Sequence, residues 1–129
     1  MSKRISKAME LIEYKGKRIM HLNLGMAGDA TPTQIRENAK LLAEMGEKGD
    51  GDQLHLIEVT GGYATPEIMA AFKEVLPAVK PYTKAAAIVG LSKMQKYLLQ
   101  TLNRLTGIGT RPFYTIEEAK NWLVEQTNK

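Results

Sequence analysis

The chain contains no cysteine among its 129 residues. Disulfide bonds, zinc sites with thiolate ligands and cysteine nucleophiles are therefore excluded. No apolar run approaches the roughly 20 residues that a membrane-spanning helix needs. The basic N-terminus is also not followed by an apolar segment of signal-peptide length. We therefore expect a cytoplasmic protein without a transmembrane segment.

Acidic residues are missing from a long stretch in the second half of the chain. Between Val75 and Ile116 there is no Asp or Glu, while six Lys and Arg residues occur there. The first 64 residues, by contrast, carry nine residues of each sign and are neutral. A surface of one sign attracts anionic partners over a distance. Two interpretations stay open, namely a basic face that binds an anionic partner and a solvated basic face without one.

Signatures of catalysis or nucleotide binding are also missing. There is no Walker motif and no G-x-G-x-x-G, so a nucleotide site would rest on Gly61 and Gly62 alone, between a strand and a helix start. Tight turns explain these two glycines better. No pair of carboxylates is marked out by its setting for acid–base chemistry. We therefore expect a protein that is not an enzyme and uses no cofactor.

His21 and His55 are the only histidines, and both lie in predicted strands. With Glu58 or Asp29 nearby they would offer two imidazoles and a carboxylate, a set that can bind a metal ion. Their positions do not follow the spacing of a metal-binding motif. We favour ordinary histidines of a sheet and expect no metal site.

The alternation of strand-like and helix-like segments predicts one α/β domain over residues 1–129. Two extended runs, 10–14 and 17–24, flank a turn at Lys15-Gly16 and predict an N-terminal antiparallel hairpin. Helices are expected over 31–46, 65–79 and 92–107 and from Thr115 onward, and further strands over 54–60, 85–89 and 111–114. We expect a mostly parallel mixed sheet with about four helices.

Hydroxyl residues mark the start of each predicted helix. The four helix starts are Thr31-Pro32 with Gln34, Thr65-Pro66, Ser92 with Gln95, and Thr115 with Glu118. Gly46 is expected to end the first helix. In the run 17–24 the apolar residues alternate, which predicts one buried face and one more polar face. The small residues of 85–89 predict a helix packed closely on that strand.

Several segments resemble SpoIIAA-like (STAS) domains, and the resemblance covers nearly the whole chain. They are Val59-Thr60-Gly61, Ala87-Ile88-Val89-Gly90-Leu91-Ser92, Leu102-Asn103-Arg104-Leu105-Thr106-Gly107, Phe113, and Glu118-Ala119 with Trp122-Leu123. The resemblance implies a βα superhelix in which neighbouring strands are consecutive in sequence and helices cover mainly one face. It also implies binding of partners without catalysis, and a more distant likeness to CRAL-TRIO lipid carriers.

Family members that antagonise anti-sigma factors carry an Asp-Ser-Ser-Gly segment, in which a partner kinase phosphorylates a serine. The corresponding region here, 60–66, has no serine doublet. Thr65 is the nearest hydroxyl and becomes the candidate for phosphorylation, although a helix cap is its simpler role.

The leading prediction is a regulatory module that binds another protein at one edge of the sheet. We expect that edge to be formed by two loops and the start of the third helix: Gly25, Asp29, Thr60, Gly61, Gly62, Tyr63, Thr65, Ser92, Lys93 and Lys96. A homodimer through an exposed sheet edge or the basic helix is kept open. Nucleic acid is not expected, because exposed aromatics and a recognisable motif are not evident.

The alternative is a carrier or sensor of an amphiphilic anion, such as a lipid. In that case the stripe Met94, Tyr97, Leu98, Leu102 and Leu105 would line an apolar cavity beneath the helix 92–107. The opposite face of the helix, with Lys93, Lys96 and Arg104, would hold the anionic head or meet an anionic membrane. A plain core explains the same stripe and is preferred.

Overall fold

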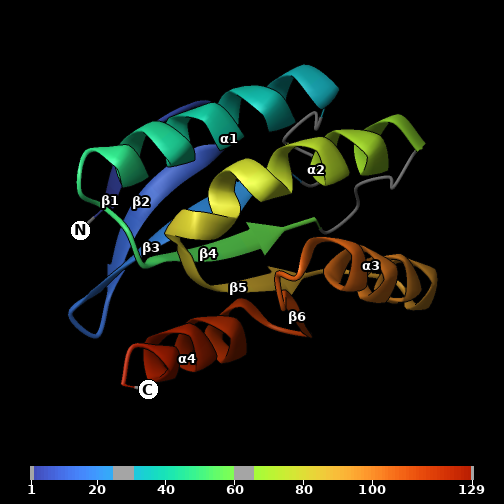
Figure 1. The fold of residues 1–129 in the computed structure, drawn as a ribbon. Helices are drawn as coiled ribbons and strands as arrows, with labels where there is room; N and C mark the ends of the chain where they lie inside the picture. Colours follow the sequence, from blue (N-terminus) through green and yellow to red (C-terminus); the bar gives the residue numbers. More distant parts are fainter. Residues whose placement is uncertain (1, 25–30, 60–65, 129) are drawn as a thin grey trace.

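A computed structural model describes residues 2–24, 31–59 and 66–128, with backbone alone at 93–95, 98, 102, 105 and 106. It is an α/β structure in which four helices pack on one six-stranded sheet (Figure 1). The strands are β1 (Ser2–Arg4), β2 (Met9–Tyr14), β3 (Lys17–Asn23), β4 (Gln53–Glu58), β5 (Thr83–Val89) and β6 (Arg111–Phe113). The helices are α1 (Pro32–Glu47), α2 (Pro66–Val79), α3 (Lys93–Thr106) and α4 (Ile116–Gln126), and a 3-10 turn, Lys80–Tyr82, follows α2.

The sheet is mixed, as the sequence predicts. Its strands lie side by side in chain order, β1 to β6. β2 is antiparallel to both of its neighbours, β1 and β3, and β3 to β6 are parallel. Lys15 and Gly16 have φ of 50° and 78°. Positive φ at both central residues gives the turn that matches the twist of a two-residue hairpin.

Strand β1 was not expected from the sequence. Ser2, Lys3 and Arg4 are all exposed, so they show no apolar alternation from which a strand could be predicted. They join the sheet only by pairing with residues 10–12 of β2. A short edge strand of this kind depends on its neighbour's backbone rather than on its own side chains.

Both faces of the sheet are covered by helices. One core contains Met20, Leu22 and Leu24 of the β3 region together with Ala39 and Leu42 of α1. The other core brings β4 and β5 against α4, and its fully buried members include Ile19, Leu56, Ala87, Ala119 and Leu123. The expected close packing of a helix on the small residues of β5 is confirmed. The expectation that the second face of β3 is more polar is wrong at Ile19, which this second core buries completely.

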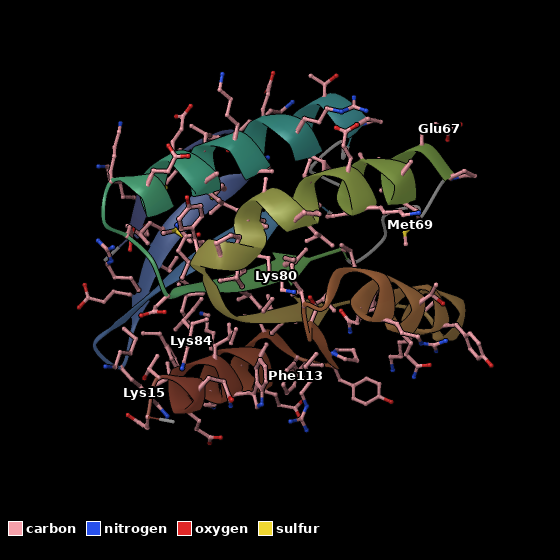
Figure 2. The ribbon with its side chains drawn as sticks, viewed as in Figure 1. Lys15, Glu67, Met69, Lys80, Lys84 and Phe113 are labelled. Atoms are coloured by element: carbon pink, nitrogen blue, oxygen red, sulfur yellow. The ribbon has the colours of Figure 1, made fainter. Side chains whose placement is uncertain are left out.

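Polar contacts join the β2–β3 hairpin, near the N-terminus, to α4, near the C-terminus. Tyr14 donates from Oη to Asn121 Oδ1 at 2.9 Å, and Lys15 donates from Nζ to the same oxygen at 2.7 Å. Figure 2 shows Lys15 beside α4 and Phe113 on the same side of the sheet. The Phe113 and Trp122 rings lie 5.5 Å apart, so β6 is also packed against α4.

Helix α1 does not end at Gly46. It continues to Glu47, and Gly49, with φ of 107°, follows the cap. Gly46 has another role, because a Cβ at this position would overlap the ring of Tyr82. The glycine permits close packing here and does not terminate the helix.

Two of the four predicted helix starts are confirmed in detail. Thr31 Oγ1 accepts from Gln34 N and Thr115 Oγ1 accepts from Glu118 N, both at 3.1 Å. The start at Thr65 lies outside the described residues, as does the Gln95 side chain. None of the helices in the described part of the chain is long and apolar enough to cross a membrane.

Candidate functional site

The predicted binding edge follows the carboxyl ends of the parallel strands. Gly25, Asp29, Thr60, Gly61, Gly62, Tyr63 and Thr65 lie outside the described residues, so their roles, including phosphorylation of Thr65, stay predictions. The structure does place β3, β4 and β5 next to one another in parallel. However, the strand order never reverses. An open α/β sheet forms its usual ligand crevice at such a reversal, so this argument for a ligand site at the edge does not apply here.

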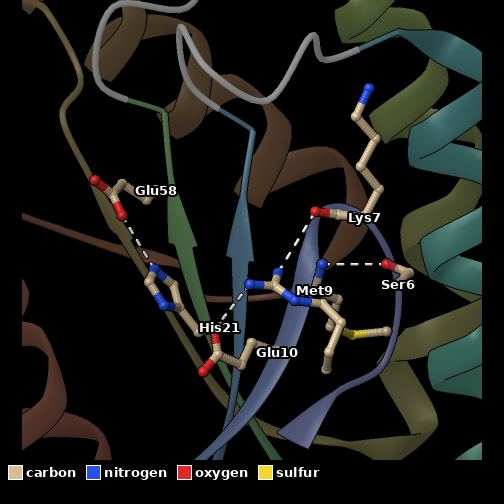
Figure 3. A network of polar contacts seen from close by, with 7 residues as sticks. Ser6, Lys7, Met9, Glu10, His21 and Glu58 are labelled. Atoms are coloured by element: carbon tan, nitrogen blue, oxygen red, sulfur yellow. Dashed lines mark hydrogen bonds and ion pairs between the residues drawn. The ribbon is translucent and has the colours of Figure 1, made fainter. Parts of the chain in front are cut away.

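A row of charged side chains crosses the sheet just below this edge (Figure 3). His21 Nε2 lies 3.0 Å from Glu58 Oε1, and Arg4 Nη2 lies 3.2 Å from Glu10 Oε2. Glu10 and His21 are direct neighbours across β2 and β3. A hydrogen bond from Ser2 and then the charges of Arg4 and His21 lower the pKa of Glu10. The row combines one ion pair, Arg4–Glu10, with the hydrogen-bonded contact of His21 and Glu58, and cross-strand contacts of this kind stabilise the pairing of neighbouring strands.

His55 does not join His21. It lies on the opposite face of β4, is only 5% exposed, and its Nε2 is 2.9 Å from Gln53 Oε1. Burial lowers the pKa of His55 to about 4. Within the described residues, no three His, Cys, Asp or Glu side chains come together in a way that could hold a metal ion.

The clearest interaction surface lies where α3 and β6 meet. Lys96 Nζ lies 4.4 Å from the centre of the Tyr114 ring, and that ring is 83% exposed. Next to Lys96 in the chain, Tyr97 is 75% exposed. Among the described residues, these two tyrosines are the large apolar side chains that stand exposed. We name Lys96, Tyr97 and Tyr114 the basic–aromatic surface.

Arg111, at the start of β6, is a second exposed cation that contacts aromatic rings. Its guanidinium carbon lies 5.4 Å from the centre of the Phe113 ring and 5.6 Å from that of Trp122. Contacts of a cation with an aromatic face stabilise by roughly 0.5–1 kcal/mol at exposed sites. They therefore hold the long side chains of Lys96 and Arg111 in place while leaving their charges near the surface.

The surface is fixed to the fold by the segment between α3 and β6. Asn103 of α3 donates from Nδ2 to Thr110 O at 2.8 Å and accepts from Thr110 N at 3.1 Å. The next residues, Arg111 to Phe113, pair with Ala87 to Val89 of β5. Tyr114, directly after β6, is thus positioned by two independent sets of hydrogen bonds.

Sequence reasoning missed both exposed tyrosines. Tyr97 was assigned to the apolar stripe of α3, but Leu99 is the residue that is buried there, at 8% exposure. Two residues of an α-helix are about 200° apart around its axis, so Tyr97 faces away from the side that Leu99 buries. Of the predicted site residues, Lys96 belongs to this surface. Ser92 lies directly before α3, and its carbonyl oxygen accepts a hydrogen bond from Lys96 N. The side chain of Lys93 lies outside the described part of the structure.

An apolar cavity lies beneath α1 and α2. Its volume is about 50 Å³, and its lining includes Leu22, Ile35, His55, Phe72 and Val79. Sites for drug-sized ligands span roughly 300–1,000 Å³, so this cavity is too small for a lipid tail. The cavity expected beneath 92–107 depends on side chains at 94, 98, 102 and 105 that the structure does not describe. It stays a prediction.

Comparison of the chain with protein-family models, curated proteins and solved structures finds no match to any of the three.

Proposed function

We propose that this protein is a non-catalytic, SpoIIAA-like regulatory module of the cytoplasm that binds an acidic partner protein through the basic–aromatic surface. The observation that carries the proposal is the stack of Lys96 on Tyr114, beside the exposed Tyr97. Tyr, Trp and Arg are enriched in the residues that dominate binding energy at protein interfaces. An exposed ring already ordered by a cation loses little further freedom on binding.

Charge supports an acidic partner. The chain has no Asp or Glu from residue 75 to residue 116, so α3, β6 and the segment between them carry positive charges only. Complementary potentials raise association rates and disfavour partners of like charge. Among the nearest acids, Glu118 is engaged in the cap of α4 through Thr115. The predicted edge that includes Ser92 and Lys93 borders the same end of α3.

The test is site-specific photocrosslinking in the native cells. A photoreactive amino acid replaces Tyr97, and the control replaces Lys73, an exposed residue of α2 on another surface. We expect one protein to be captured at position 97 and not at 73, with acidic residues at the captured site. With that partner purified, Tyr114→Ala should weaken binding about tenfold or more, while Tyr114→Phe, which keeps the ring, should not.

Three outcomes would replace the proposal. Equal capture at both positions would show that the surface has no specific partner. Binding of single-stranded RNA that depends on Tyr114 would assign the surface to nucleic acid, where bases stack on aromatic side chains. A lipid-sized mass that accompanies the gently purified chain in native mass spectrometry would favour the carrier of amphiphilic anions.

A further inference from the structure

Helices α1 and α2 run side by side in the same direction on one face of the sheet (Figure 1). An open groove of about 540 Å³ lies between their side chains. Part of its lining is small and apolar: Ala39, Ala43, Val75 and Ala78. The rest of its lining is mostly charged: Arg36, Lys40, Glu44, Glu47 and Glu74. We name this feature the α1–α2 groove.

The charges on the α1 side of the groove are segregated along the helix. Arg36 and Lys40 lie in its first half, and Glu44 and Glu47 in its second half. Arg36 donates from Nε to Glu74 Oε2 at 2.7 Å across the groove. No ion pair within the described residues engages Lys40, Glu44 or Glu47. Because Glu74 pairs with Arg36, the charges on the α1 side of the groove that are unpaired among the described residues are Lys40 in the first half and Glu44 and Glu47 in the second half.

This order of charges is complementary to itself. We propose that the protein forms a two-fold homodimer in which α1 of each copy lies antiparallel along α1 of the other, at the edge of the α1–α2 groove. A two-fold axis over α1 midway between Lys40 and Glu44 leaves each of them about 3 Å from the axis along the helix, at 1.5 Å per residue. Lys40 then faces Glu44 of the partner subunit, and Glu44 faces the partner subunit's Lys40.

The outer pair of charges follows the same symmetry. Arg36 lies about 9 Å and Glu47 about 7.5 Å from that midpoint, in opposite directions, so Glu47 of one copy comes near the Arg36–Glu74 pair of the other. Ala43 lies next to the axis, and its small side chain lets the two helices approach closely. The interface thus gains two new ion pairs, both between Lys40 and Glu44, from one symmetric contact.

Other surfaces fit a second copy less well. The edge strands β1 and β6 are three residues long, and they carry Lys3 and Arg4 or the proline Pro112, features that discourage pairing between sheet edges. A two-fold contact through the basic face of α3 would set like charges against each other. The α1–α2 groove is the described surface on which both signs are arranged symmetrically.

Charge reversal with complementation tests the dimer by sedimentation velocity across a range of concentrations. We expect the unaltered chain to sediment as a dimer at the higher concentrations. Lys40→Glu and Glu44→Lys should each sediment as monomers, because each places two like-charged pairs at the axis. An equimolar mixture of the two variants should restore the dimer, because every pair then joins opposite charges. Lys73→Glu and Glu125→Lys, exposed charges away from the groove, serve as controls and should stay dimeric.

A monomer at all concentrations for the unaltered chain would overturn the proposal. So would a dimer that survives both single reversals, or a mixture that stays monomeric, since either result places the contact elsewhere. Circular dichroism of each variant checks that the fold is retained. The outcome is independent of the photocrosslinking test, because the groove and the basic–aromatic surface share no residue.

Discussion

Gly46 lies in the last turn of α1 against the side chain of Tyr82, and replacing it with alanine sets two effects against each other. In a helix interior, Gly→Ala stabilises by about 1 kcal/mol through backbone entropy. At this position, however, the added Cβ would lie 2.7 Å from Tyr82 Cβ and still closer to two carbons of its ring. Carbon atoms at optimal contact are about 3.5–4.0 Å apart, so the ring or the helix end must move.

The steric effect should dominate. Overpacking of this kind costs about 1–3 kcal/mol and the helix gain offsets about 1 kcal/mol of it, so we expect Gly46→Ala to lower the free energy of unfolding by up to about 2 kcal/mol. For a chain of this length that upper value corresponds to a fall in Tm of about 7 °C. In a Tyr82→Ala background the obstruction is absent, and the same substitution should raise stability by up to about 1 kcal/mol.

The assay is urea unfolding of the four proteins in a double-mutant cycle, followed by circular dichroism. The expected signature is a change of sign between the two backgrounds. The close packing of the Tyr82 ring on Gly46 is refuted if Gly46→Ala stabilises the unaltered protein, or if the substitution has the same effect with and without the Tyr82 ring.

Three further predictions concern the rest of the fold. The pKa of the buried His55 is about 4 in the folded protein, against 6.5 in the unfolded chain. The free energy of unfolding should therefore be greatest above pH 6.5 and fall by up to about 3 kcal/mol as the pH drops to 4. In urea unfolding, a His55→Leu variant should lose much less over the same pH interval. Asn103→Ala should cost about 1–3 kcal/mol, because it leaves the amide and carbonyl of the buried Thr110 unpaired, and hydrogen exchange at Thr110 should accelerate. Gly16→Ala should cost about 1 kcal/mol because φ there is 78°, whereas Gly51→Ala, at an open position with ordinary φ, should be nearly neutral in the same assay.

Local patterns predicted most of the elements and their boundaries. Some features depend only on side-chain size or on neighbours within a few positions, so they could be predicted from the sequence. They are the Thr31 and Thr115 caps, the hairpin turn at Lys15 and the packing of a helix on the small residues of β5. β1 could not be predicted, because its three exposed residues carry no pattern and pair only through the backbone. The end of α1 was predicted one residue too early for a related reason. The glycine at position 46 leaves room for the side chain of Tyr82, 36 positions away in the chain.

The candidate site was only partly predictable. Lys96 was predicted as a binding residue and contacts the exposed Tyr114 ring, but its role in binding stays a prediction. Tyr97 was assigned to the core, and Tyr114 received no role in binding. Both errors concern which side of an element faces the sheet. The packing of α3 and the pairing of β6 with β5 determine which side faces the sheet, and the residues near each tyrosine in the sequence do not predict it.

The sequence by itself determined the α/β class, the hairpin, the caps at Thr31 and Thr115 and the absence of acids from residue 75 to residue 116, because propensity, capping and composition act within a few residues. Only the tertiary structure decided that His21 and His55 face opposite sides of the sheet, that Lys96 stacks on Tyr114, and that a groove lined by charges of both signs lies between α1 and α2. These features depend on strand register and on helix packing, which are set by contacts between residues far apart in the chain.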